Sequence, residues 1–443
     1  MPKRVPASVQ TDQSIRQLLS SGSAGDVRSE LIRLGVRRII EEALEREVGE
    51  FLGRGFYQRQ ASPVQREGGG PAGAEARGYR NGYRTGHLDS AEGEIPFAVP
   101  QVSDTAEPYE SKIRQHVKGR SEQLEQLATE MYARGLSTRD IEAAFTDEDG
   151  NKLLSRSAVS DITEVLWQQY EAFATRDLSG YEIAYLFMDG VAERLNPSER
   201  RQAVLCAWGI DIEGNKHLLH LAPGTKEDAV SCREFIQDMK RRGLCDPLLE
   251  TTDGAPGLIK AVEECFPRSA RQRCLVHKMR NLQAKVTDEQ LWPQLNAEAS
   301  SVYQAANPET ARLLKDGFIK RWQKKFPTAV ACFEEDFEAC IAHLVFPVTH
   351  RKAIRSTNLL ERLFEENRRR TKVLPHAFGE RPMLKLMFAA VIRAAEKWRK
   401  LKVTNFEREQ LRLLREEMNE RFKRRHTPAV PPAPSAFSSK VGT

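Results

Sequence analysis

Long apolar runs are missing from this chain of 443 residues. None approaches the roughly 20 consecutive apolar residues that a membrane-spanning helix needs. The first ten residues, MPKRVPASVQ, lack the apolar core of a secretory signal peptide. We therefore expect a cytoplasmic protein with no membrane partner.

Cysteine is also scarce, and its seven residues are scattered along the chain. Such an odd, dispersed set does not form a disulfide framework, so we expect reduced thiols.

A strong excess of one charge sign is absent as well, because the net charge is only +6 and the pI is about 8.9. This balance is a mild indication of a polyanionic partner. The hydrophobic content of 40% and charged content of 29% are typical of a globular protein. The chain is too long for one ordinary core and has no internal repeat, so several domains are expected.

The N-terminal part begins with a helical pattern over Ser29–Gly53, in which apolar residues recur at spacings of three and four. A linker rich in Gly, Pro and Ala follows at 60–78. The stretch EGEIPFAVPQV at 92–102 alternates like a strand, but its two prolines restrict it to the edge of a sheet.

Between the linker and this strand, the stretch GYRNGYRTG at 78–86 alternates tyrosine, arginine and turn residues. One interpretation is a solvated hairpin or turn. The other is an arm against a nucleic-acid backbone, in which Tyr79 and Tyr83 stack or pack while Arg80 and Arg84 contact phosphates.

Residues 121–166 are typical of helix, turn, helix, loop and helix. Ser137 is expected to cap the second helix, and Ser155 or Ser157 the third. The pattern predicts either a helix-turn-helix-like DNA-binding unit or a plain three-helix packing unit. The candidate DNA contacts on these helices are Arg139, Arg156 and Ser157.

From residue 181 the periodicity changes to that of an α/β domain, with a strand, a hairpin, a helix, a strand, a helix and a strand. The hairpin turns at EGN, residues 213–215. Residues 288–350 lack strand signals and predict a helical insertion. A long apolar helix, a charged helix over 405–426 and a Pro/Ser-rich tail end the chain.

Two aspartates stand in matching contexts, because LFMDG and TTDG each end an apolar strand with Asp followed by Gly. Most Asp-Gly pairs are simple turns. However, open α/β sheets bind ligands at the carboxyl ends of their strands. Asp189 and Asp253 would converge there on a hard divalent cation such as Mg²⁺.

A third acid would complete a site for two metal ions that hydrolyses or transesterifies phosphodiesters. Glu361 in the stretch STNLLERLFEENRRRTK is the candidate, because it borders the apolar face of its helix. The other interpretation of this stretch is a solvated, salt-bridged helix. We keep that interpretation for Glu365 and Glu366.

Together these motifs resemble the IS256 family of bacterial transposases, the prokaryotic relatives of the Mutator group. The resemblance rests on LFMDG, TTDG, FPRSARQRCLVHKMRN, WQKKFP and FPVTHRKAIRSTNLLERLFEENRRRTK, with the N-terminal motifs GYRNGYR and YARGLSTRDIE. It implies a DDE transposase whose RNase H-like core is interrupted by an all-helical insertion. Its catalytic, metal-binding acids would be Asp189, Asp253 and Glu361, with two Mg²⁺ or Mn²⁺ ions.

The resemblance also covers a Cys-x-x-His motif, matched here by Cys274 and His277. A zinc site would need a second closely spaced pair of ligands, which the neighbouring sequence lacks. We expect these two residues beside the active site, together with Asn358, which either caps its helix or supports the acid. Trp322 either packs the insertion or contacts a flipped base.

Basic residues flank the expected acids and would position DNA through its phosphates. Those around the second acid are Arg271, Arg273, Lys278 and Arg280. Those after the third acid are Arg368, Arg369, Arg370 and Lys372.

The sequence therefore predicts a multidomain, mainly α protein with an α/β catalytic core of RNase H-like type. The expected segments are an N-terminal helical domain (1–60), a linker with a basic arm (61–110), a helix-turn-helix-like domain (111–175), the core (176–287 and 351–402), the all-α insertion (288–350), and a charged helix with a disordered tail (403–443).

The expected function is that of an insertion-sequence transposase, a homodimer that binds the terminal inverted repeats and target DNA in the bacterial nucleoid. It would cut DNA with metal-activated water and join the 3′-hydroxyl to the target. The family resemblance also implies a circular intermediate. The alternatives are an RNase H-like nuclease without strand transfer and a non-catalytic DNA-binding regulator.

Overall fold

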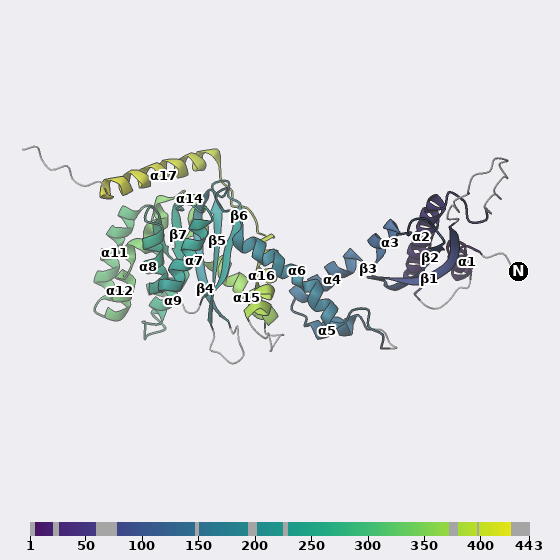
Figure 1. Ribbon diagram of the computed structural model, residues 1–443. Helices are drawn as coiled ribbons and strands as arrows, with labels where there is room; N and C mark the ends of the chain where they lie inside the picture. The colour runs from purple at the N-terminus through teal and green to yellow at the C-terminus, as the bar shows by residue number, and fades with distance from the viewer. Residues whose placement is uncertain are drawn as a thin grey trace, which may run out of the picture. The chain divides into compact units, whose positions relative to one another are not determined.

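Figure 1 shows the computed structural model of the chain. The structure describes residues 5–20, 26–58, 78–146, 150–193, 202–224, 229–371, 380–396 and 398–426. The chain divides into two compact units, the N-terminal unit Met1–Val165 and the C-terminal unit Leu166–Thr443. Each unit has an apolar core of its own. The linker expected at 60–78, apart from Gly78, and the tail beyond His426 lie outside the described residues.

The N-terminal unit begins with helices that pack beside a small sheet (Figure 1). Helix α1 (Ala7–Ser20) packs on α2 (Val27–Phe51), and α2 packs on β2 (Gly93–Ser103). The sheet has the order β2-β1-β3, with β1 (Tyr79–Ser90) antiparallel to β2 and parallel to β3 (Gly119–Arg120). Its core holds Ile40, Leu44, Phe97 and Val99.

Two expectations for this region are confirmed. The amphipathic helix predicted over Ser29–Gly53 is α2, and it ends just before Gly53, whose φ of 63° lies in the left-handed region that glycine favours. The proline-containing strand predicted over 92–102 is β2, and it forms an edge of its sheet.

The remaining helices of this unit follow the predicted order. They are α3 (Lys112–Val117), α4 (Glu122–Ala133), α5 (Thr138–Ala144) and the first part of α6 (Arg156–Thr175). Ser137 and Asp140 form a capping box at the start of α5. Ser155, and not Ser157, caps α6, because its Oγ accepts from the Ala158 N–H at 3.2 Å.

The C-terminal unit is built on a five-stranded sheet with the order β6-β5-β4-β7-β8. The predicted hairpin is the antiparallel pair of β5 (Gln202–Asp211) and β6 (Lys216–Gly224). Strand β4 (Ile183–Glu193) is antiparallel to β5 and parallel to β7 (Leu249–Thr252), which in turn pairs parallel with β8 (Ala270–Arg273). This mixed sheet is consistent with an RNase H-like core.

Helices cover both faces of the sheet (Figure 1). Alternate residues of β4 point to opposite faces, as the two-residue period of a strand requires. Leu186 and Met188 join the core under α7 (Ala229–Arg241) and α8 (Pro256–Cys265). Tyr185 and Phe187 join the other core, to which α6 and the later helices contribute. These later helices are α15 (Asn358–Thr371), α16 (Glu380–Glu396) and α17 (Asn405–His426).

The segment predicted as a helical insertion is helical and has its own core, centred on Phe333 and Phe318. Its helices are α10 (Trp292–Tyr303), α11 (Pro308–Trp322), α12 (Pro327–Glu334), α13 (Phe337–Ile341) and the 3₁₀ helix η1 (Ala342–Val345), followed by α14 (Val348–Ile354). Leu275 and Leu282 of α9 (Leu275–Gln283) belong to the same core, so the insertion packs on α9.

Among the described residues, none of the helices has both the length and the hydrophobicity that a membrane span requires.

The turn between β5 and β6 depends on Gly214, which has a φ of +84°. A Cβ at this position would lie 2.0 Å from the carbonyl oxygen of Leu401. We therefore expect Gly214→Ala to lower the free energy of unfolding by more than about 1 kcal/mol. Urea unfolding followed by tryptophan fluorescence measures this, because all five tryptophans lie in the C-terminal unit.

The matched control is Gly180→Ala, since a Cβ at Gly180 would meet nothing within 4 Å. Equal stability of the two variants would contradict the assigned role of the turn.

Candidate active site

Asp189 in β4 and Asp253 just after β7 lie side by side, because the two strands are parallel neighbours. Met188 of β4 pairs in register with Thr252, the last residue of β7, and each aspartate is the residue that follows in the chain. Adjacent strands run roughly 5 Å apart, which brings the two carboxylates into the same small region. The predicted convergence of these acids is therefore what the sheet topology produces.

The two Asp-Gly pairs differ in structure. Strand β7 ends at Thr252, and Gly254 has a φ of +91°, as expected for a turn. A Cβ on Gly254 would collide with the guanidinium of Arg273, which lies over this turn. In contrast, β4 continues past Asp189 to Glu193, so the prediction that this strand ends at Asp189 is wrong. The strand continues because β5 still pairs with it there, Glu193 with Gln202.

The Asp189 carboxylate is buried, with only 7% of the residue exposed. Its Oδ1 accepts a hydrogen bond from the Gly190 N–H at 2.9 Å. Burial and the charge of Asp253 raise the pKa of Asp189 to about 7, and Glu361 contributes in the same direction. The Asp253 carboxylate is held by the Ala255 N–H at 2.9 Å. The site therefore concentrates negative charge that only a cation or a proton can neutralise.

The start of helix α15 is fixed to the sheet by buried contacts. The N–H and hydroxyl of Thr357 approach the Cys274 Sγ at 3.4 and 3.5 Å. The Leu275 N–H donates to the Arg355 carbonyl at 2.9 Å, and the Thr251 hydroxyl donates to the Ile354 carbonyl at 2.7 Å. These contacts set the position of Glu361 in the first turn of α15.

Thr357, and not Asn358, precedes the helix as its cap. The Thr357 carbonyl accepts from the Leu360 and Glu361 N–H groups at 2.8 and 3.2 Å, whereas Asn358 is already the first helical residue and is exposed. Thr357 is fully buried. Sequence reasoning missed this residue, although its place just before an Asn at a helix start was a usable signal.

The Glu361 carboxylate is engaged by two neighbours on α9. The Arg280 guanidinium donates to both of its oxygens, at 3.0 and 3.3 Å, and the His277 Nε2 lies 3.4 Å from Oε1. The prediction assigned Arg280 to DNA. In this structure it forms an ion pair with the third acid.

Cys274 and His277 lie beside the acids, as the motif predicted. Contact with the Cys274 thiol raises the pKa of His277 above its usual value, and the charges of Asp189 and Glu361 add to this effect. Although burial alone would raise the pKa of Cys274, hydrogen bonds from His277 and Thr357 lower it. Cys274 thus links the sheet to α15, while His277 faces the carboxylates.

The donor set suits a hard divalent cation, because oxygen ligands from crowded carboxylates are what Mg²⁺ and Mn²⁺ bind. The raised pKa of buried Asp189 is the observation that supports this fit. Within the described ranges, no three His, Cys, Asp or Glu side chains are grouped so that they could hold a metal as they stand. Glu361 is paired with Arg280, and completing the set requires it to exchange this partner.

Several residues predicted to contact DNA have partners inside the C-terminal unit. Arg271 pairs with Asp336 at 2.8 Å and with Glu263 at 3.2 Å. Lys278 is 1% exposed and donates to the Glu335 carbonyl. Arg271 links β8 to α8 and to the insertion, and Lys278 links α9 to the insertion, so their surroundings favour a structural role.

Trp322 is buried in the core of the insertion, 4% exposed, and its Nε1 donates to Glu298 at 2.8 Å. Its surroundings support the packing interpretation.

After the third acid, Arg368 and Arg369 are exposed on α15, as is Glu365. Arg370 belongs to this helix, but its side chain and that of Glu366 lie outside what the structure describes, as does all of Lys372.

In the N-terminal unit, the stretch 78–86 lies in β1. Arg80 donates to the Arg54 and Gly55 carbonyls at 2.9 and 3.2 Å. The Tyr83 hydroxyl donates to Glu45 at 2.8 Å. These two side chains therefore hold β1 against α2 and its C-terminal turn. Tyr79, 46% exposed, lies under the guanidinium of Arg54.

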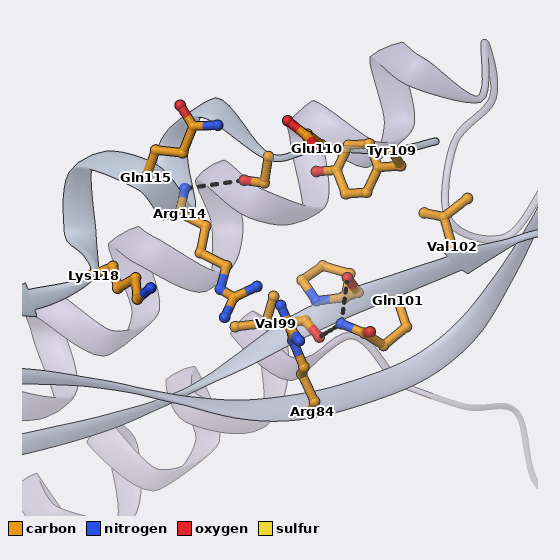
Figure 2. Close-up of a pocket in the computed structure, with 11 residues that line it drawn as sticks. Arg84, Val99, Gln101, Val102, Tyr109, Glu110, Arg114, Gln115 and Lys118 are labelled. Carbon is orange, nitrogen blue, oxygen red and sulfur yellow. Dashed lines mark hydrogen bonds between the residues drawn. The ribbon is translucent and has the colours of Figure 1, made fainter. Parts of the chain in front are cut away.

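Arg84 is exposed and lines a cavity of about 380 Å³ between α3 and the β1–β2 pair. Figure 2 shows Arg84 and Arg114 reaching into the same region, with Lys118 at its border. Sequence reasoning missed Arg114 and Lys118, which lie on and just after a short helix that carries no motif. Arg84 is therefore exposed to solvent and lies near two other basic side chains, Arg114 and Lys118.

The candidate contacts on the helix-turn-helix-like segment are all exposed: Arg139, Arg156 and Ser157. Arg156 also pairs with Glu142, with its N–H donating at 2.8 Å. The Ser157 hydroxyl lies 2.9 Å from that of Ser155. Their role in DNA binding stays a prediction.

Comparison with known proteins identifies the relatives of this chain. The family described as "Transposase, Mutator family" matches residues 8–401. The transposase for insertion sequence element ISRM5 of Rhizobium meliloti (strain 1021) is 30% identical over 373 residues, 83% of this chain and 88% of the relative. That of IS6120 from Mycolicibacterium smegmatis is 31% identical over 270 residues, 61% of this chain and 83% of the relative. That of IS1081 from Mycobacterium tuberculosis is 26% identical over 392 residues, 88% and 89% of the two chains.

The mixed sheet, its helices on both faces and the acids gathered at adjacent strands define an α/β enzyme core of the kind expected for a transposase. The chain belongs to the Mutator family of transposases, the enzymes that catalyse DNA transposition. This confirms the resemblance inferred from the sequence motifs.

The burial of Asp189 predicts a pH-dependent stability in metal-free buffer. The pKa of Asp189 is about 7 in the fold and about 3.9 in an unfolded chain. The folded state therefore binds the proton more tightly, and wild type loses stability as pH rises from about 4 to 7. We expect Asp189→Asn to be more stable than wild type by on the order of 1–3 kcal/mol at pH 8.

Urea unfolding with EDTA present, followed by tryptophan fluorescence at pH 5 and pH 8, checks this difference. At pH 5 the gap should be much smaller, because wild-type Asp189 is then largely protonated. The control is Asp316→Asn, an exposed acid on α11. A stability gap that is the same at both pH values would contradict the argument.

Proposed function

We propose that this chain is the transposase of an insertion sequence and that Asp189, Asp253 and Glu361 form its catalytic centre. It binds the terminal inverted repeats, cuts the DNA at the ends of the element, and joins the 3′-hydroxyl to target DNA. The observation that carries the proposal is the register of β4 with β7, which places Asp189 and Asp253 side by side, with the charge of Glu361 also acting on Asp189.

Asp189, Asp253 and Glu361 would hold two Mg²⁺ or Mn²⁺ ions, which supply an activated water or 3′-hydroxyl and stabilise the leaving oxygen. The buried carboxylate of Asp189 orients its ligand oxygens through the Gly190 N–H. His277, beside Glu361, has a raised pKa and can donate a hydrogen bond to a phosphate oxygen at the site.

The exposed cations supply the DNA contacts in this proposal. Arg84 on β1, Arg139 and Arg156 on the helices, and Arg368 with Arg369 on α15 are exposed. Each phosphate they neutralise releases counterions, so binding weakens steeply with salt. A homodimer fits the need to hold two element ends, with α2 as a candidate contact. The circular intermediate is what the likeness to the IS256 group implies.

The first test replaces each acid by its amide: Asp189→Asn, Asp253→Asn and Glu361→Gln. We expect each variant to lose DNA cleavage by at least about 1,000-fold, because metal binding and charge stabilisation are both removed. Salt-sensitive DNA binding should remain within a few-fold of wild type. A gel assay of end cleavage with Mg²⁺ or Mn²⁺, paired with fluorescence anisotropy, separates the two properties.

Glu365→Gln is the matched control, since this exposed acid lies one turn further along α15 and should leave cleavage unchanged. Cleavage by all three acid variants would refute the site. Cleavage without 3′-end joining would favour the nuclease alternative, and binding without any cleavage would favour the regulator.

The pairing of Arg280 with Glu361 allows a second test of the proposed metal site, in which metal affinity is measured directly. Arg280 occupies both oxygens of the third acid, so it competes with a cation for them. We expect Arg280→Gln to bind Mn²⁺ several-fold more tightly than wild type in titration calorimetry without DNA. Lys285→Gln removes an exposed charge shortly after α9 without touching Glu361, and controls for overall charge. Equal affinities for the two variants would show that Arg280 does not compete.

A further inference from the structure

A second cavity lies beside the acids, in the angle between α9, α10 and the start of α15. Its volume is about 400 Å³. We call it the α9–α15 cavity. Arg280 and Asn358 line it, and both are close to the third acid: Arg280 is bonded to Glu361, and Asn358 lies three residues before it on α15. The cavity therefore borders the candidate active site.

The lining carries three cations, of which Arg280 has an acidic partner, Glu361, just outside the cavity. Arg280, Lys352 and Arg355 all face the cavity, and no aspartate or glutamate lines it. Among the described residues, the side chains of Lys352 and Arg355 form no ion pair with a carboxylate. Arg355 is only partly accessible, so its charge is incompletely hydrated. An anion is the ligand that such a set of cations attracts.

The same cavity has an apolar side. Trp292 at the start of α10 and Met279 of α9 line it, and both are partly exposed, although they also pack against the core of the insertion. An indole beside a thioether provides a flat, polarisable surface on which a planar ring can stack. Trp322, by contrast, is 4% exposed and cannot offer such a surface in this structure.

Side-chain amides complete the lining. Gln283, Gln304 and Asn358 reach the cavity, and all three are exposed residues. Amides both donate and accept hydrogen bonds, as the edge of a nucleobase does. A ligand that combines an anionic group, a planar ring and polar ring edges is a nucleotide.

We propose that the α9–α15 cavity holds one unpaired nucleotide of the DNA substrate next to the phosphate that is cut. The base lies against Trp292 and Met279, and its phosphate faces Lys352 and Arg355. This inference rests on the proposed function and deepens it, because it says that the DNA must be unstacked at the site of reaction.

The size of the cavity supports a single nucleotide. Sites of roughly 300–1,000 Å³ hold one small ligand, and a cavity near the lower end of that range suits one nucleotide better than a base pair. The nucleotide must therefore leave the stack, as in other enzymes that extrude a nucleotide from a duplex. Stacking of one base on an aromatic side chain strengthens binding by about tenfold.

The test compares two short duplexes of otherwise identical sequence, one fully paired and one carrying a single unpaired 2-aminopurine nucleotide. We expect wild type, as the full chain, to bind the duplex with the unpaired nucleotide about tenfold more tightly. Its 2-aminopurine fluorescence should fall on binding, because the base stacks on Trp292. Trp292→Ala should lose most of this preference, Trp292→Phe should keep much of it, and Lys352→Ala should weaken binding of the unpaired nucleotide.

Lys320→Ala is the matched control, because Lys320 is an exposed lysine of α11 that does not line the cavity. A second measurement needs no variant. With 5-iodouracil as the unpaired base, ultraviolet cross-linking to wild type followed by mass spectrometry should mark peptides within residues 275–304.

Three outcomes would overturn the inference. They are equal binding of the two duplexes by wild type, an unchanged preference in folded Trp292→Ala, and cross-links confined to other peptides. Each of these is compatible with metal-dependent cleavage by wild type. Failure of the inference about the cavity is therefore distinguishable from failure of the proposed function, because only the latter predicts that wild type does not cleave DNA.

Discussion

The parallel pairing of β4 with β7 is the constraint on which the site depends. It carries Asp189 and Asp253 to adjacent positions, although 63 residues separate them along the chain. A strand in the middle of a sheet is buried on both faces, which is why β4 contributes side chains to two different cores. Packing on both faces holds the backbone rigid, and a rigid backbone can keep two like charges close at the cost of a raised pKa for Asp189.

The third acid reaches the same region by a different kind of link. The chain leaves the sheet after β8, builds the insertion, and returns at α14. Two contacts join the segment before the insertion to the segment after it: the Leu275 N–H donates to the Arg355 carbonyl, and Thr357 contacts the Cys274 thiol. Because these contacts hold the two ends of the inserted segment together, the insertion can form its own core without displacing Glu361.

The positions of many helices and strands, and of the two aspartates, were predictable from the periodicity of apolar residues. Apolar runs ending in Asp-Gly indicated the two aspartates, and Ser137 marked a helix start. What periodicity could not show depended on partners distant in sequence. The strand extends past Asp189 because β5 continues to pair with it, and Lys278 is buried because its partner, Glu335, lies in the insertion. A basic residue looks the same in sequence whether it faces DNA or a carboxylate of its own chain.

The electrostatics of the site explain why an arginine lies on the third acid. The charges of Glu361 and Asp253 both act on the Asp189 carboxylate, so without a cation Glu361 would add to the repulsion there. Arg280 neutralises it, yet remains largely exposed, with 59% of its side chain accessible. An exposed ion pair contributes little stability, so it can be exchanged at small cost. In the proposed centre, Glu361 would help to hold a metal ion, and Arg280 would then be released from this carboxylate. The freed guanidinium would be placed to contact a phosphate of the bound DNA.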